Sequence, residues 1–184
     1  MTQAPVTTSI DRGSTTYAYL VSIVAATSGL LFGFYIAVIN GAIIFLREQF
    51  RLSEVQTEVA ASSLLFGCVA GALAAGWLSD RFGRRRILLV SALLFAASAF
   101  GAALPRNLEQ FTAARFLGGV AIGMASLLAP LYIAEVSPPR IRGRLVSLNQ
   151  MAITTGILLA YLINWLLSFG GPASWRWMFA SAAV

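Results

Sequence analysis

The sequence predicts an all-α membrane protein, and three observations support this. Of the 184 residues, 58% are hydrophobic and 11% are charged, with a mean hydropathy of +0.79. A soluble domain carries about 25% charged residues, and so short a chain cannot hide this much apolar surface from water. Apolar runs recur at lengths near the ~20 residues that cross a bilayer as a helix. Nearly all of the arginines fall in the short breaks between these runs.

Five apolar runs are long enough to span a membrane, and a sixth begins before the chain ends. Their approximate ranges are 17–46, 59–78, 87–104, 108–134 and 145–169, and the sixth opens near Trp175. We therefore expect five complete transmembrane helices plus the start of a sixth. Residues 1–16 are polar and rich in Thr and Ser, so we expect a disordered cytoplasmic tail followed by an incomplete transmembrane bundle at 17–184.

The end of the chain predicts a fragment or a truncated product. The last ten residues would form only about 15 Å of helix, half the thickness of a membrane core. A helix that stops inside the hydrocarbon leaves its last carbonyl groups without partners.

The breaks between the runs carry ordinary helix-ending signals. Ser53 and Gln56 have the spacing of a capping box at the start of the second helix. Gly83 allows a tight reversal between the second and third helices. The prolines beside the breaks remove backbone N–H groups where this does least harm: Pro105, Pro138, Pro139 and Pro172.

The arginines also predict the orientation of the spans. With the N-terminus in the cytoplasm, the inner side holds eight arginines: Arg12, Arg81, Arg84, Arg85, Arg86, Arg140, Arg142 and Arg144. The outer side holds four: Arg47, Arg51, Arg106 and Arg176. Because cytoplasmic loops are enriched in basic residues, this favours a cytoplasmic N-terminus in the cell membrane. It also explains the net charge of +6 without a nucleic-acid partner.

Small residues recur at four-residue spacing in three of the predicted helices. They are Gly29, Gly33, Ala37 and Gly41 in the first, Gly67, Gly71 and Ala75 in the second, and Gly119 and Gly123 in the fourth. Such faces let helices approach closely in lipid. They serve plain packing, or they also let helices slide and rock during function.

Composition argues against several kinds of chemistry. The chain has no histidine and a single cysteine, Cys68, so we expect no metal, no cofactor and no disulfide framework. An enzyme would need clustered acid–base residues inside the helices. The only charged residue deep in a predicted helix is Arg115, so we do not expect an enzyme.

Two long motifs identify a family resemblance. GWLSDRFGRRR, with Gly76, Asp80 and Gly83, resembles the loop motif of the major facilitator superfamily. RFLGGVAIGMASLLAPLYIAEVSPPRIRGR resembles the sugar porter pattern, and LLFGFYIAVING and SLNQMAI are similar to the first and fifth helices of that family. The resemblance implies twelve helices in two six-helix halves, of which this chain supplies the N-terminal one. It also implies a sugar substrate, a lipid bilayer and a missing C-terminal half as partners.

The fifth predicted helix carries a polar stripe inside an apolar run. Gln150, Thr154, Ile157, Tyr161 and Asn164 share one face at steps of three and four residues. Such a stripe points at a neighbouring helix or a cavity, not at lipid. The resemblance implies that Gln150 hydrogen-bonds sugar hydroxyls, with Ile153, Ile157 and Phe32 beside the sugar. Hydrogen bonding between helices is the alternative.

Arg115 needs a partner, because a lone arginine in a membrane helix costs at least about 2.5 kcal/mol. In proton-coupled members of the family the partner is an aspartate, at the position where this chain has Tyr35. Tyrosine, with a reference pKa of about 10, stays protonated near neutral pH. We expect Tyr35 to accept a hydrogen bond from Arg115 or to lie beneath its guanidinium, and coupling through this site to be absent. Proton symport through another group is the alternative.

The resemblance also implies a cytoplasmic salt-bridge cluster that ties the two halves together when the outside is open. Its members would be Asp80, Arg81, Gly83, Arg84, Arg85, Glu135 and Arg142. The alternative is a local surface ion pair worth about 0–1 kcal/mol.

Taken together, these residues predict half of a transporter that moves a monosaccharide by alternating access. The alternatives are a truncated remnant without transport or a membrane sugar sensor on the same scaffold. The 184 residues alone are expected not to transport, since one half cannot enclose a substrate.

Overall fold

The computed structural model describes residues 12–171 and 174–181, and within these ranges it contains six α-helices and no strands. In chain order they are α1 (Arg12–Phe50), α2 (Glu54–Phe82), α3 (Arg84–Ala103), α4 (Leu108–Val136), α5 (Arg142–Ser168) and α6 (Ser174–Ala180). The first five are long and apolar enough to cross a membrane, as predicted. The start of a sixth helix near Trp175 is confirmed as well.

Several helices extend beyond the apolar runs that predicted them, because capping and polar residues continue the helix past the hydrocarbon. α2 begins at Glu54, where Val59 was expected, and α1 begins at Arg12, where Tyr17 was expected. Residues 12–16, predicted as part of a disordered tail, are therefore helical. The rest of the predicted tail, 1–11, lies outside the described residues.

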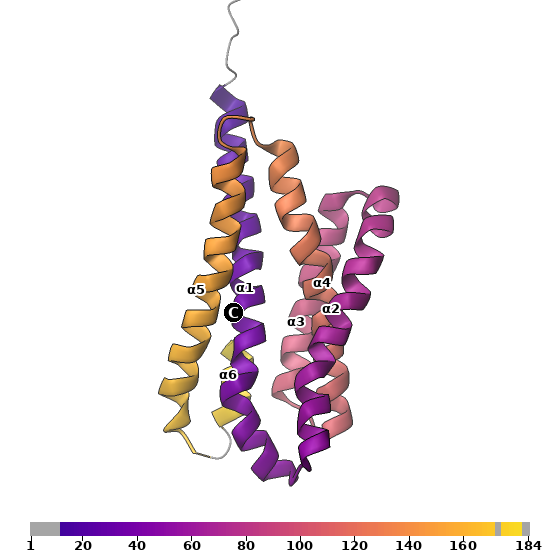
Figure 1. Cartoon of the computed structure of the whole chain (residues 1–184), viewed down its shortest axis with the longest axis vertical. Coiled ribbons are helices and arrows are strands. Elements are labelled where there is room, and N and C mark those ends of the chain that lie inside the picture. The colour runs from indigo at the N-terminus through magenta and orange to yellow at the C-terminus, as the bar shows by residue number, and fades with distance from the viewer. Residues whose placement is uncertain (1–11, 172–173, 182–184) are drawn as a thin grey trace, which may run out of the picture.

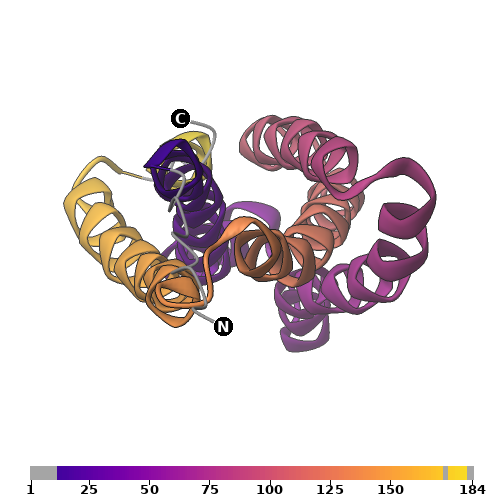
Figure 2. The same ribbon diagram turned by 90° about the horizontal axis from the view of Figure 1, so that it is seen from above.

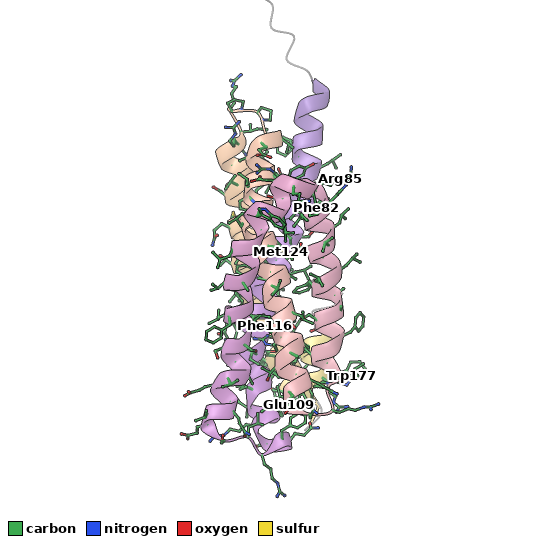
Figure 3. All side chains as sticks on the ribbon, turned by 90° about the vertical axis from the view of Figure 1, so that its right-hand side faces the viewer. Phe82, Arg85, Glu109, Phe116, Met124 and Trp177 are labelled. Atoms are coloured by element: carbon green, nitrogen blue, oxygen red, sulfur yellow. The ribbon has the colours of Figure 1, made fainter. Side chains whose placement is uncertain are left out.

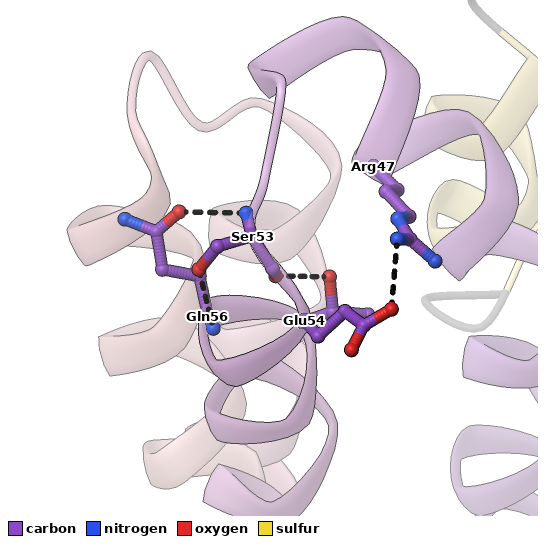
Figure 4. A network of polar contacts seen from close by, with 5 residues as sticks. Arg47, Ser53, Glu54 and Gln56 are labelled. Carbon is purple, nitrogen blue, oxygen red and sulfur yellow. Dashed lines mark hydrogen bonds and ion pairs between the residues drawn. The ribbon is translucent and has the colours of Figure 1, made fainter.

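The predicted capping box at the start of α2 is confirmed (Figure 4). The Gln56 backbone N–H donates to Ser53 Oγ at 3.3 Å, and the Ser53 N–H donates to Gln56 Oε1 at 3.0 Å. Arg47 and Glu54 form an ion pair at 3.6 Å beside it.

The reversal at Gly83, between α2 and α3, has a φ of 87°, a left-handed backbone conformation that favours glycine.

The long helices run up and down, so alternate connections meet at the same end (Figure 1). The α2–α3 turn and the α4–α5 connection lie at the end where α1 begins. In the side view, Phe82 and Arg85 lie near this end, and Glu109 and Trp177 lie near the other (Figure 3). Both arginine-rich connections therefore share one end of the bundle.

Two helix pairs are packed at backbone distance. The first is α1 against α5, which lie side by side in both views (Figures 1 and 2). A Cβ added at Gly33 would collide with the backbone carbonyl of Ile153, and one at Gly156 with the carbonyl of Leu30. The predicted small-residue face of α1 is thus a packing surface, and its partner glycine on α5 was not predicted.

The second close pair is α2 against α4, whose glycines face each other's backbone. A Cβ at Gly67 would strike the carbonyl of Phe116, and one at Gly119 would strike the carbonyl of Leu64. Gly71 and Gly123 repeat the arrangement one turn further along, against Val120 and Cys68. The close approach predicted for these glycines is confirmed.

The short helix α6 closes the core from one end with two buried aromatic side chains. The Trp175 indole N–H donates to Gln49 Oε1 on α1 at 2.7 Å. Phe179 packs edge-on against Phe111 of α4, with ring centroids 5.3 Å apart, and against Tyr35 of α1 at 6.1 Å. This aromatic cluster fixes the position of the first candidate site residue, Tyr35.

Candidate functional site

Arg115 lies two turns into α4, about 10 Å from Leu108, with its side chain inside the bundle and only 1% exposed. Its Nη1 donates to the backbone carbonyl of Tyr35 at 3.2 Å. Its Cζ lies 5.1 Å from the centre of the Tyr35 ring and 5.6 Å from that of Phe179. Among the described residues, no ion pair involves Arg115. Two aromatic faces and one carbonyl thus stabilise a buried cation in place of a carboxylate.

The Tyr35 hydroxyl is engaged in a chain of hydrogen bonds across three helices. Ser98 Oγ on α3 donates to the Ala114 carbonyl on α4 at 2.7 Å. Since a serine hydroxyl has one proton, Ser98 can only accept at the 2.8 Å contact with Tyr35. The phenol is therefore the donor there. The predicted arrangement in which Tyr35 lies beneath the guanidinium of Arg115 is confirmed, and the hydroxyl also bonds to Ser98.

Sequence reasoning missed the residues that complete this site. Phe95 packs edge-on against the Tyr35 ring with centroids 4.9 Å apart, and Ser98 and Phe179 make the contacts described above. Ser91 and Ser98, seven residues apart on α3, are both buried, and polar residues on one face of an apolar helix were a usable signal. Phe95 and Phe179 gave no such signal, because aromatic residues are common throughout these helices.

Helix α5 exposes two chemically different faces. Gln150, Thr154 and Tyr161 are exposed on one side, which we call the polar face of α5. About a quarter turn further round, the exposed residues are apolar: Met151, Leu158 and Leu162. Since lipid cannot satisfy an amide, the polar face is the side of α5 that is suited to water or to a hydroxyl-rich ligand.

The predicted site residues divide between this surface and the interior. Phe32, Ile153 and Ile157 are partly buried, and Ile153 packs against Gly29 and Gly33 in the seam between α1 and α5. Tyr35 is 0% exposed, so the described chain does not bring it to the surface that exposes Gln150. Asn164, predicted on the same stripe, is buried, and its Nδ2 donates to the Val38 carbonyl at 3.2 Å.

At the arginine-rich end, one pair of the predicted charge cluster is in contact. Arg84 Nη1 lies 2.8 Å from Glu135 Oε1, an ion pair that links α3 to α4 without the alignment of a hydrogen bond. Arg81 lies over the Trp77 ring at 5.7 Å, and Arg142 donates to the Ser137 carbonyl at 3.5 Å. Asp80 and Arg85 are exposed, and neither takes part in the ion pairs found among residues 12–171 and 174–181.

The structure also has an open groove of about 560 Å³ between α2 and α4, away from these residues. Three of its lining side chains carry a hydroxyl group: Ser62, Ser63 and Thr112. The others are apolar: Val59, Phe66, Ala113, Phe116 and Leu117. Ser62 and Ser63 donate back to the carbonyls of Glu58 and Ala60, at 2.7 and 2.9 Å. The groove is therefore poorly suited to a sugar.

In the described part of the chain, no three His, Cys, Asp or Glu residues gather to hold a metal ion.

Comparison with known proteins decides the family. Residues 21–184 match the family described as "Sugar (and other) transporter". The chain belongs to this family of sugar transporters. It is 45% identical over 169 residues to a glucose transport protein of Synechocystis, covering 91% of this chain and 36% of that protein. It is 44% identical over 168 residues to the galactose-proton symporter of Escherichia coli, with the same two coverages.

Solved structures give the fold of this sugar transporter chain. A major facilitator superfamily proton:xylose symporter bound to 6-bromo-6-deoxy-D-glucose superposes with a TM-score of 0.86 at 36% identity, covering 91% of this chain and 42% of that one. The inward-open xylose transporter of E. coli superposes with a TM-score of 0.83 at 37% identity, covering 91% and 45%. The fold is that of the N-terminal half of the superfamily, as predicted. The chain spans 36% of the length of the two curated relatives named above.

Proposed function

We propose that the full-length protein containing this chain carries a monosaccharide across the cell membrane by alternating access, with this chain as its N-terminal half. The observation that carries the proposal is the polar face of α5. Its Gln150 amide is exposed between apolar surfaces, and an amide both donates and accepts hydrogen bonds, as sugar hydroxyls require. Phe32, Ile153 and Ile157 supply apolar surface beside it for the carbon faces of the sugar.

The names of the relatives support a monosaccharide as the substrate. They are a glucose transport protein, a galactose-proton symporter and a D-xylose-proton symporter, at 45, 44 and 37% identity. In this proposal, the C-terminal half also contributes to the preference among these sugars.

We further propose that Tyr35 and Arg115 do not carry a coupling proton. The Tyr35 hydroxyl is buried and donates a hydrogen bond to Ser98, and a phenol does not ionise near neutral pH. Arg115 interacts with a carbonyl and two rings, and its Nε has no hydrogen-bond partner among the described residues. If the protein is a symporter, like its galactose and xylose relatives, the proton must bind another group.

The cytoplasmic side is the end that carries the arginine-rich connections, in our proposal. There the Arg84–Glu135 ion pair at 2.8 Å would be part of the contact that holds the inner side closed and breaks when it opens. Bound sugar would shift the balance between the two states by binding one of them more tightly.

Uptake of radiolabelled sugar into vesicles tests the transport proposal. D-glucose, D-galactose and D-xylose are the probes, with the full-length protein containing this chain. Gln150→Leu should raise KM or abolish uptake of the preferred sugar. Thr155→Val is the matched control, because Thr155 is exposed on the other side of α5 and its hydroxyl donates back to the Met151 carbonyl at 2.8 Å. The absence of saturable uptake of any probe by the unmodified protein would disprove the proposal.

A proton gradient imposed on the same vesicles tests the coupling proposal. Tyr35→Phe should leave the response of sugar uptake to the gradient unchanged, because the proposal assigns no coupling proton to Tyr35 or Arg115. Accumulation that requires Tyr35, and is lost in Tyr35→Phe, would contradict the proposal. Accumulation that survives Tyr35→Phe would mean that the proton binds elsewhere.

A further inference from the structure

A second polar pair lies on the exposed side of the seam between α1 and α5. Asn40 Nδ2 on α1 donates to the Tyr161 hydroxyl oxygen on α5 at 3.0 Å, across 121 residues of sequence. Both side chains are exposed, Tyr161 by 52%. Tyr161 is part of the polar face of α5, and Asn40 was not among the residues that the sequence singled out.

This hydrogen bond leaves much of the bonding capacity of the pair unused. Asn40 keeps one N–H and its carbonyl oxygen, and Tyr161 keeps its O–H. In the described part of the chain, neither side chain makes another hydrogen bond. Two donors and one acceptor therefore lie close together on an exposed surface.

The pair lies within the depth of the membrane. Asn40 is about 10 Å along α1 from Arg47, the first charged residue toward that end of the helix, and Tyr161 is about 10 Å from the end of α5 at Ser168. Groups at this depth cannot be satisfied by lipid. The apolar residues Met151, Leu158 and Leu162 occupy the α5 face that is suited to lipid, and the polar face with Tyr161 lies about a quarter turn away from it.

Helical geometry puts Tyr161 in line with Gln150. The two are eleven residues apart on α5, about three turns and 16 Å along the axis, with only about 20° between their directions. In the orientation proposed above, Gln150 lies toward the cytoplasmic end and Tyr161 toward the outer end. A ligand that moves along the polar face of α5 from outside meets Tyr161 first.

From this arrangement we infer that Asn40 and Tyr161 form an outer binding site for the sugar, which hydrogen-bonds its hydroxyl groups before it reaches Gln150. The inference rests on the proposed transport function. The bond between the two side chains holds the phenol in place, so that its O–H can donate to a sugar oxygen while the Asn40 carbonyl accepts from a hydroxyl.

Kinetics with the full-length protein containing this chain provide the first test. Tyr161→Phe keeps the ring and removes the donor. It should raise KM for uptake from outside by about 3- to 10-fold, the value of one hydrogen bond, and change the maximal rate less than about 2-fold. A lower melting temperature with unchanged KM would overturn the inference, because the pair would then only join α1 to α5.

Thiol labelling from outside provides a second, independent test. Tyr161→Cys in a Cys68→Ala background is treated with a membrane-impermeant reagent, with and without D-glucose, D-galactose or D-xylose. Labelling that the transported sugar slows is the expected result, and Leu162→Cys is the lipid-facing control that should not react. Sugar protection at Gln150→Cys but not at Tyr161→Cys, or no labelling of Tyr161→Cys at all, would overturn the inference. Failure of the unmodified protein to take up any of the three sugars would instead contradict the proposed function itself.

Discussion

The guanidinium of Arg115 lies over the ring of Tyr35, with its Cζ 5.1 Å from the ring centre, and donates a hydrogen bond to the carbonyl of the same residue at 3.2 Å. One tyrosine thus binds the buried cation through both its side chain and its backbone. The hydroxyl donates a hydrogen bond to Ser98. The ring and the hydroxyl of Tyr35 therefore have separate roles that substitutions can distinguish.

Tyr35→Phe should cost less stability than Tyr35→Leu. Phenylalanine keeps the ring beneath Arg115 and loses one buried hydrogen bond, at a cost of about 0.5–1.5 kcal/mol. Leucine also loses the cation–π contact, which is worth up to about 2 kcal/mol when desolvated. Melting temperatures of the purified full-length variants give the order. Equal losses in the two variants would show that the hydroxyl, and not the ring, stabilises this site.

Arg115→Lys should destabilise the protein at least as much as Arg115→Met. A lysine ammonium keeps the buried charge but lacks the planar group that lies between two rings while donating to a carbonyl. Methionine removes the charge, and with it the cost of at least about 2.5 kcal/mol of keeping an arginine inside a membrane helix. Thermal unfolding measures the difference. A stable lysine variant beside an unfolded methionine variant would indicate a carboxylate partner from outside the described residues.

Gly33→Ala and Gly119→Ala should both be strongly destabilising, by about 1–3 kcal/mol or more, because each new methyl group would meet a backbone carbonyl that cannot rotate away. Gly76→Ala is the matched control on α2, since a Cβ there meets no atom within 4 Å. It should be neutral or stabilising by up to about 1 kcal/mol. Similar melting temperatures for Gly33→Ala and Gly76→Ala would contradict the close packing of α1 and α5.

Gly83→Ala should destabilise the protein through its backbone alone. The φ of 87° is unfavourable for any residue with a Cβ, although no atom lies within 4 Å of the added methyl group. We expect the free energy of unfolding to fall by about 1–3 kcal/mol, whereas the Gly76→Ala control should be neutral. Unchanged thermal stability would mean that the α2–α3 turn readily adopts another conformation.

Glu135→Gln should have little effect on stability, because its ion pair with Arg84 is 28–42% exposed and such pairs contribute about 0–1 kcal/mol. If the pair helps to close the inner side, the same variant should lower the maximal rate of sugar uptake. The double variant with Arg84→Gln should then be no slower than the single variants. An unchanged maximal rate in Glu135→Gln would show that the Arg84–Glu135 ion pair is a surface contact with no role in closing the inner side.

The sequence was sufficient to predict the spans, because the length and apolar character of a membrane helix are local properties. It also predicted the Ser53–Gln56 cap and the turn at Gly83, which depend on a few neighbouring residues. The partner of the α1 glycines was not predictable in this way. Gly156 is a single glycine in α5, and its position opposite Leu30 follows from how distant helices pair.

The candidate site shows the same division between local and distant information. Arg115 and Tyr35 were expected to meet through a family resemblance, and they do. Nothing in the local pattern says that Tyr35 lies inside the bundle while Phe32, three residues earlier, lies near its surface, because α1 packs against neighbours on more than one side. The donor–acceptor chain through Ser98 joins residues 63 apart, which only the fold brings together.

The pairing of α1 with α5 has a consequence for how the chain is made. Asn40 and Tyr161 are 121 residues apart, and synthesis at about 5–20 residues per second separates their emergence from the ribosome by roughly 6–24 s. During that interval the small-residue face of α1 and the Asn40 amide are already in the translocon or the bilayer, and α5, their native neighbour, has not yet been made. A factor that binds this face of α1, or a premature stop before residue 142, would therefore affect the insertion and folding of the chain before any transport takes place.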